Sequence, residues 1–85
     1  MEEFDKQIVR AQRMYQLKRY KEAIGFAKKA LAIDIFNVHA YQTIILAYTV
    51  LRDYEKAKEY GEIASKYNPN SPEILHARGL AVYQM

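Results

Sequence analysis

Two segments of equal length, residues 4–37 and 38–71, carry apolar and small residues in the same order. Matching residues lie 34 positions apart: Leu17 and Leu51, Tyr20 and Tyr54, Ala23 and Ala57, Ala30 and Ala64. Residues 72–85 repeat only the first half of this unit. A repeat of this length is one supersecondary unit that buries its apolar face by stacking on its neighbours. The sequence therefore predicts one domain, residues 1–85, made of two full units and a half unit.

Apolar residues in each unit recur at spacings of three and four, the period of an α-helix. The pattern predicts five helices, over residues 2–17, 20–33, 38–51, 54–67 and 72 to the end. The links between them are about two to four residues long, so consecutive helices should be antiparallel neighbours. No window alternates with a period of two beside a hairpin turn, so we expect an all-α fold without strands.

Helix boundaries are marked by residues with known positional preferences. Asn37 and Asp53 are predicted to cap the third and fourth helices, because their side chains accept hydrogen bonds from the first free amides. Pro69 cannot continue the fourth helix. The run Ser71-Pro72-Glu73 then predicts a new helix start, with a capping hydroxyl, a proline in the first turn and an acid near the positive end of the helix dipole.

The 34-residue helix–turn–helix period, with an aromatic residue opening the second helix and small residues along it, resembles the tetratricopeptide repeat (TPR) family. The resemblance is strongest in the middle unit and rests there on Tyr41, Ile44, Ala47, Tyr48, Asp53, Tyr54, Ala57, Ala64 and Pro69. It implies a right-handed α-solenoid of stacked antiparallel helical hairpins. Residues 4–37 would be the first repeat, 38–71 the second, and 72–85 a half-repeat that forms a closing helix.

Small residues are expected where helices cross closely, because a large side chain there would push the helix axes apart. These residues are Ala11, Ala23, Ala30, Ala57, Ala64 and Gly79. Arg10 and Arg78 replace residues that are usually large and apolar in the family, which suggests that both ends of the stack face water. Gly61 within a helix costs about 1 kcal/mol relative to alanine. We therefore expect either a close neighbour at Gly61 or a weak hairpin.

Several classes of function are disfavoured by composition. The chain has no Cys and a net charge of only +3, and its longest apolar run, residues 43–51, is about half of what spans a bilayer. The acidic N-terminus does not resemble a secretory signal. We expect a cytoplasmic protein that is not associated with a membrane. No arrangement of Ser, His and acid suggests a catalytic triad, and His39 with His76 is a weak zinc signal. We expect no enzyme activity, no cofactor and no metal.

Binding is the better-supported function. In a TPR-like stack, the first helix of each unit lines the concave face, and the resemblance implies a peptide-binding groove there. The groove residues would be Ile8, Gln12, Tyr15, His39, Gln42, Leu46, Thr49, His76, Leu80 and Tyr83. Aliphatic and aromatic groups anchor peptide side chains, and amides bond to peptide backbone. The alternative is that some of the apolar members fill the space between helices and contact no ligand.

These observations predict a non-catalytic scaffold that binds a protein or peptide partner. One TPR subclass grips a C-terminal carboxylate with Lys, Asn and Arg, but the equivalent positions here hold Ile8, Gln12, Thr43, Glu73 and Ala77. A carboxylate-clamp chaperone tail is therefore not the expected ligand. Two alternatives remain at this stage. The first hairpin is basic, at Lys18, Arg19, Lys21, Lys28 and Lys29, and could bind nucleic acid or an acidic surface. The second alternative is structural: the chain could be a fragment of a longer repeat array, or its last helix could bind a second copy of the chain.

Overall fold

The computed structural model describes the backbone of residues 3–84 and the side chains of residues 6–80. Its five α-helices are α1 (Glu3–Gln16), α2 (Tyr20–Ile33), α3 (Val38–Val50), α4 (Tyr54–Tyr67) and α5 (Pro72–Gln84). No strand occurs over residues 3–84. The all-α prediction is confirmed, and α2 and α4 begin and end at the predicted residues. The ends predicted for α1 and α3 are each one residue too long at the C-terminal side.

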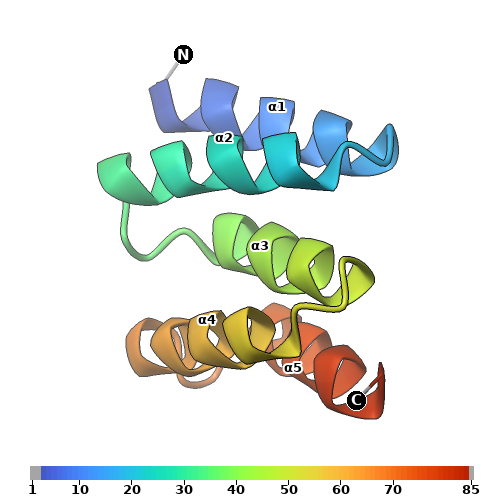
Figure 1. The fold of residues 1–85 in the computed structure, drawn as a ribbon. Helices are drawn as coiled ribbons and strands as arrows, with labels where there is room; N and C mark the ends of the chain where they lie inside the picture. Colours follow the sequence, from blue (N-terminus) through green and yellow to red (C-terminus); the bar gives the residue numbers. More distant parts are fainter. Residues whose placement is uncertain (1–2, 85) are drawn as a thin grey trace.

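The helices pack in chain order, as Figure 1 shows, with α1 and α2 at one end, α3 in the middle, and α4 and α5 at the other end. Each helix packs on the next one along the chain. In addition, α1 and α5 both pack on α3, which makes the odd-numbered helices one continuous layer. Over the part of the chain that the structure describes, the backbones of α2 and α4 do not come close to one another, although the side chains of Lys28 and Tyr60 meet. The odd-numbered helices are therefore closer together than the even-numbered ones.

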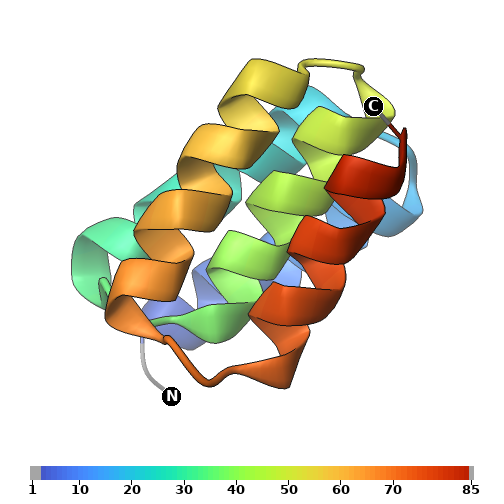
Figure 2. The same ribbon diagram turned by 90° about the horizontal axis from the view of Figure 1, so that it is seen from below.

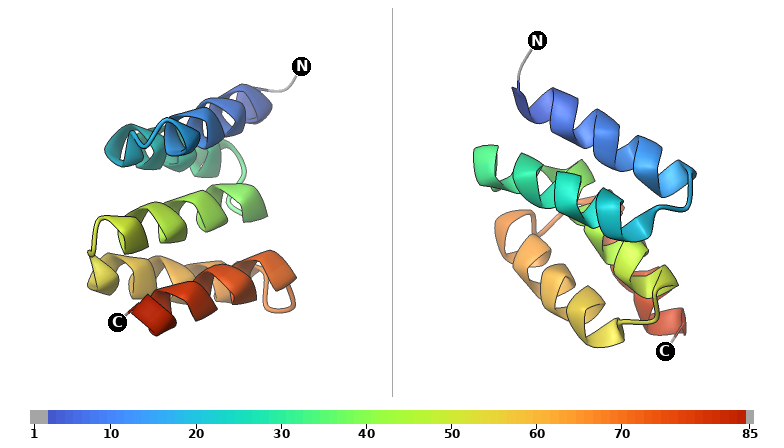
Figure 3. Two further views of the ribbon diagram at one scale, coloured as in Figure 1. Left: turned by 90° about the vertical axis from the view of Figure 1, so that its right-hand side faces the viewer. Right: turned by 45° about the horizontal axis from the view of Figure 1, so that its top comes forward.

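Helix α3 is the centre of the packing. Figures 2 and 3 show it between α4 and α5 on one side and the first hairpin on the other, and it contacts all four other helices. Tyr41, Ile44 and Ile45 are fully buried, on a helix with apolar residues around most of its circumference. A helix that is apolar on several faces must be covered on several sides. The four neighbouring helices provide this cover for α3.

The turn in both hairpins has the same backbone conformation, which the sequence pattern did not reveal. Lys18 and Arg52, 34 positions apart, adopt left-handed backbone conformations with φ of 63° and 64°. The amides around Lys18 bond back to the Tyr15 carbonyl (3.0 Å) and the Met14 carbonyl (2.8 Å). The amides around Arg52 make the equivalent bonds to the two carbonyls that lie 34 residues after those of Tyr15 and Met14. This is the Schellman helix end, which usually places glycine at the left-handed position.

The predicted helix caps are present. The Asn37 side chain accepts a hydrogen bond from the Ala40 amide at 3.0 Å, and Asp53 accepts one from Lys56 at 3.3 Å. The Ser71 hydroxyl oxygen accepts a longer bond, 3.4 Å, from the Ile74 amide. These bonds fix where α3, α4 and α5 begin, because they satisfy amides that have no partner within the helix.

Close helix crossings occur at the five predicted alanines, but Gly79 departs from the expectation. Ala11, Ala23, Ala30, Ala57 and Ala64 are essentially inaccessible to solvent. Gly79 is exposed, and a Cβ added to it would meet no atom within 4 Å. The reason is that no described helix packs on that side of α5.

Gly61 and Arg78 lie against one another, and each accounts for the residue type found at the other position. A Cβ on Gly61 would lie 3.0 Å from Cγ of Arg78, so the glycine makes room for the aliphatic part of this side chain. The Arg78 guanidinium donates a hydrogen bond to the Ser65 hydroxyl oxygen at 2.7 Å. The expectation that Arg78 faces water was therefore wrong in part: its stem packs across α4 while its charge bonds to a side chain of that helix. Of the two explanations for Gly61, a close neighbour is the one that the structure supports.

Ala57→Leu tests the close crossing at α4, where Ala57 is 1% exposed. Three extra carbon atoms cannot fit without separating helices, so the free energy of unfolding should fall by roughly 1–3 kcal/mol. Chemical denaturation followed by circular dichroism measures it. Ala32→Leu, at an exposed position of the similar helix α2, is the matched control and should change little. Equal stability of the two variants would contradict a tight crossing at Ala57.

The Tyr41 hydroxyl is buried and has no hydrogen-bond partner among the described residues. Burial, reinforced by the nearby Tyr67 and Tyr60 hydroxyls, raises the pKa of Tyr41 to about 12. The neutral phenol is therefore the form compatible with the fold. An unpartnered buried polar group costs about 1–3 kcal/mol, so this hydroxyl opposes folding while the ring contributes apolar burial.

Tyr41→Phe should raise the free energy of unfolding by about 1 kcal/mol at pH 7, because it removes this hydroxyl and keeps the ring. The raised pKa also predicts a pH dependence. The unfolded-state tyrosine ionises near pH 10, so the wild type should lose stability progressively between pH 10 and pH 12. The advantage of Tyr41→Phe should widen over that range. Urea denaturation at pH 7 and pH 11 measures it, and an unchanged difference would contradict the burial of the hydroxyl.

Candidate binding groove

Two adjoining hollows lie on the layer formed by α1, α3 and α5. The larger, of about 340 Å³, is lined by Tyr15, Leu46, Thr49, Val50, Arg52, Tyr54 and Leu80. The second, of about 290 Å³, is lined by Gln12, Tyr15, Gln16, Gln42, Thr43 and Leu46. They share the lining residues Tyr15 and Leu46, so they lie next to one another, and together they are called here the odd-helix groove. Its volume is in the range of small-ligand and side-chain pockets.

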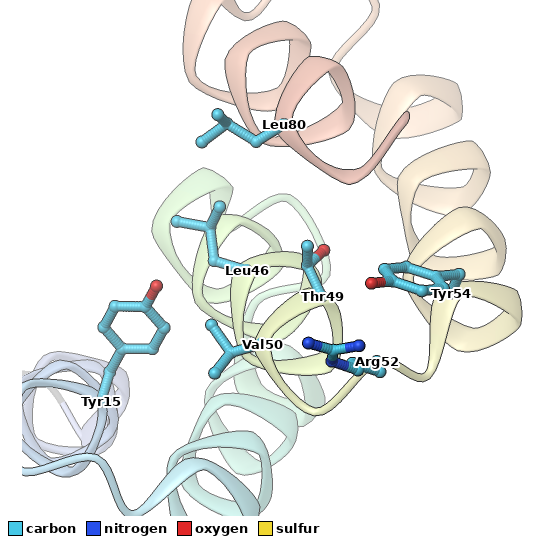
Figure 4. Close-up of a pocket in the computed structure, with 7 residues that line it drawn as sticks. All are labelled: Tyr15, Leu46, Thr49, Val50, Arg52, Tyr54 and Leu80. Carbon is cyan, nitrogen blue, oxygen red and sulfur yellow. The ribbon is translucent and has the colours of Figure 1, made fainter. Parts of the chain in front are cut away.

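Residues of α1, α3, α4 and α5 and of the turn between α3 and α4 line the larger hollow, as Figure 4 shows. Tyr15 extends from α1 toward Leu46 and Val50 of α3, and Leu80 of α5 lies across from Leu46. Residues four apart on a helix share a face, which explains why Leu46 and Val50 point the same way. The other face of α3 is occupied by the core residues Tyr41, Ile44 and Ile45. One helix therefore supplies both the core and the groove floor.

Tyr15 is the aromatic wall of the odd-helix groove. Its ring meets the Tyr20 ring edge-on, with centroids 5.3 Å apart, and this contact limits where the ring can lie. Partial burial, with a smaller contribution from Tyr20, raises the pKa of Tyr15. At neutral pH its hydroxyl is therefore protonated and can donate a hydrogen bond to a carbonyl oxygen placed in the groove.

The end of the groove is shaped by the turn between α3 and α4. The Thr49 hydroxyl donates a hydrogen bond to the Ile45 carbonyl oxygen at 2.7 Å. This hydroxyl proton is therefore not available to a ligand, and Thr49 presents its methyl group to the groove. Arg52 follows in the left-handed position of the turn, and Figure 4 shows its guanidinium beside Thr49 and Val50. The groove thus has an apolar floor with a cation at one end.

The structure brings six of the ten predicted groove residues to the odd-helix groove: Gln12, Tyr15, Gln42, Leu46, Thr49 and Leu80. Ile8 belongs instead to the buried core cluster, so its side chain packs between helices and offers no open surface. His39 and His76 are exposed but line neither hollow. Tyr83 lies outside the residues whose side chains are described.

Five lining residues were not predicted: Gln16, Thr43, Val50, Arg52 and Tyr54. Val50 could have been found, because it lies four positions after Leu46 on the same helical face. Arg52 could not, since its direction depends on a left-handed backbone that is uncommon for a residue with a side chain. Tyr54 is partly buried, with the rest of its ring at the groove end.

The odd-helix groove carries no arrangement typical of a metal site. Among the residues described, no three His, Asp or Glu side chains gather closely enough to hold an ion. Crossing a bilayer would need a longer and more apolar helix than any found between residues 3 and 84.

The basic residues of the first hairpin divide into two groups. Lys28 lies over the rings of Tyr48 and Tyr60, at 5.9 and 5.6 Å from their centroids, and Lys29 lies 5.3 Å from the centre of Phe26. Proximity to the Tyr48 hydroxyl raises the pKa of Lys28, so its charge persists at neutral pH. These aromatic faces are covered by the chain's own cations and are not free to stack on bases. The other three, Lys18, Arg19 and Lys21, are exposed at the turn and the start of α2.

Comparison with known proteins returned no matching family model, no similar curated protein and no similar solved structure.

Proposed function

We propose that this chain is a TPR-like, right-handed α-solenoid that binds a segment of a partner protein in the odd-helix groove. The helix packing supports a stack that curves toward its odd-numbered helices, as this proposal requires. Among the described residues the backbones of successive odd-numbered helices approach closely, whereas those of α2 and α4 do not, so α1, α3 and α5 would lie on the inner side of the curve. A concave inner layer is the usual binding surface of helical repeat proteins.

The observation that carries the proposal is the meeting of two hollows at Tyr15 and Leu46. Two adjoining hollows that extend over several helices fit an extended peptide better than a compact small molecule. Leu46, Val50 and Leu80 offer an apolar surface to a peptide side chain. Gln12 and Gln42 can bond to a peptide backbone on the other part of the groove.

The charge at the groove suggests the chemistry of the peptide. Of the described residues that line the two hollows, Arg52 is the only Lys or Arg, and none is Asp or Glu. A segment with a large apolar side chain and an acidic residue a few positions away would place its apolar group on Leu46 and its carboxylate near Arg52. The proposed ligand is thus an apolar segment with one neighbouring acid, and it is bound without a cationic clamp.

Leu46→Asp tests the groove. Proteins captured by the wild-type chain from a cell lysate are identified by mass spectrometry, and the affinity for a purified partner is then measured by calorimetry. The variant should weaken binding at least tenfold, because it places a charge on the apolar floor. Val9→Asp makes the same kind of change at an exposed position of α1 that lines neither hollow, and it should bind normally.

A second groove variant separates lost binding from lost folding. Leu46 is partly buried against the core, whereas Val50 is 46% exposed and lines the same hollow. Val50→Asp should therefore keep the helicity and melting temperature of the wild type and still lower the affinity for the partner. If Val50→Asp and Val9→Asp bind equally well, the odd-helix groove is not the binding site.

A further inference from the structure

The strongest unexplained feature lies on α5, on the side away from α3 and α4. Leu75 is 58% exposed. Its counterparts one and two units earlier, Tyr41 and Gln7, are 0% and 9% exposed. In both full units the second helix of the hairpin packs against the first. The described residues contain no helix that covers α5 in the same way.

Gly79 lies on the same stripe as Leu75, four residues on. Its counterparts Ile45 and Ala11 are completely buried, yet a Cβ at Gly79 would touch nothing within 4 Å. A glycine inside a helix lowers helix stability relative to alanine. Nothing among the described residues requires that glycine, whereas a helix crossing closely at that point would require it. The stripe is therefore shaped for another helix.

The orientation of a helix that could cover this side of α5 follows from the repeat. The helices that cover α1 and α3 run antiparallel to them, so the helix that covers α5 should also be antiparallel to it. A two-fold axis perpendicular to a helix generates an antiparallel pair from two identical helices. Such axes relate the subunits of most homodimers. A second α5 therefore satisfies the orientation without any further element.

We propose that the Leu75–Gly79 stripe of α5 binds the same stripe of a second copy of this chain. With the axis at the level of residue 77, Leu75 of each copy lies opposite Gly79 of the other. The large side chain of one helix then enters the space left by the small residue of its partner, in both directions.

The stripe also suits burial in such a pair, because its described residues carry no charge. The nearest cation, Arg78, is already bonded to the Ser65 hydroxyl and packed over Gly61. Bringing a second helix close would therefore not bury an unpartnered charge, which is the main electrostatic obstacle to a dimer. A single helix pair is smaller than a standard interface, so the dimer should be weak and concentration-dependent.

Sedimentation equilibrium over a wide range of concentrations tests this proposal. The weight-average mass of the wild type should rise from 10.0 kDa toward twice that value. Gly79→Glu should remain monomeric over the same range, because it places a charged side chain in the interface. Gly25→Glu is the matched control: Gly25 also lies inside a helix with open space around it. Both substitutions favour helix formation, so loss of the dimer in Gly79→Glu alone cannot be ascribed to unfolding.

The absence of Cys allows a direct test of the register. A mixture of Leu75→Cys and Gly79→Cys chains, oxidised under mild conditions, should give mainly the mixed disulfide. Leu75→Cys mixed with Gly25→Cys should give only random products. A wild type that stays monomeric at millimolar concentration, or equal dimerisation of both glutamate variants, would overturn the proposal. Random disulfides in the first mixture would overturn it as well.

Discussion

The close packing of α3 against its four neighbours is the interaction on which the rest of the structure depends. Tyr41, Ile44 and Ile45 contribute the large buried side chains, and alanines on the adjoining helices let them approach. A small domain has little buried surface to lose. Large residues on one central helix and small residues around it therefore use the available apolar area efficiently. The cost is that the core tolerates neither enlargement of the alanines nor loss of the large side chains.

The same helix links stability to the proposed function. The groove floor, at Leu46 and Val50, lies on α3 one turn from the buried side chains, so the helix that holds the core also holds the floor. Walls come from α1 and α5, which pack directly on α3. A groove built in this way needs little ordering when a ligand binds, which favours affinity. Its shape depends on how the helices stack, whereas its chemistry depends on a few exposed residues.

Much of this could be read from the sequence, because local rules govern it. The apolar period gave the helices, and Asn37, Asp53 and Ser71 marked where three of them begin, since capping needs only neighbouring residues. The stack was predicted from the repeat. The features that escaped prediction depend on where the backbone and side chains point. An apolar pattern, for example, does not show that Lys18 and Arg52 adopt a left-handed backbone.

The groove was predictable to the extent that it lies on helices. Gln12, Gln42 and Leu46 were found from their helical positions, but Ile8, at an equally suitable position, is buried, because its burial depends on how α1 packs against the helices around it. Arg78 illustrates the same difficulty, because its place depends on the absence of a side chain at Gly61, on another helix.

Native-state hydrogen exchange, followed residue by residue by NMR, tests the central role of α3 most directly. If α3 holds the structure together, the amides of Tyr41–Ala47 should exchange only through global unfolding, with the highest protection in the chain. The amides of α5, which is covered on fewer sides, should exchange faster through local opening. Equal or lower protection in α3 than in α5 would contradict the account.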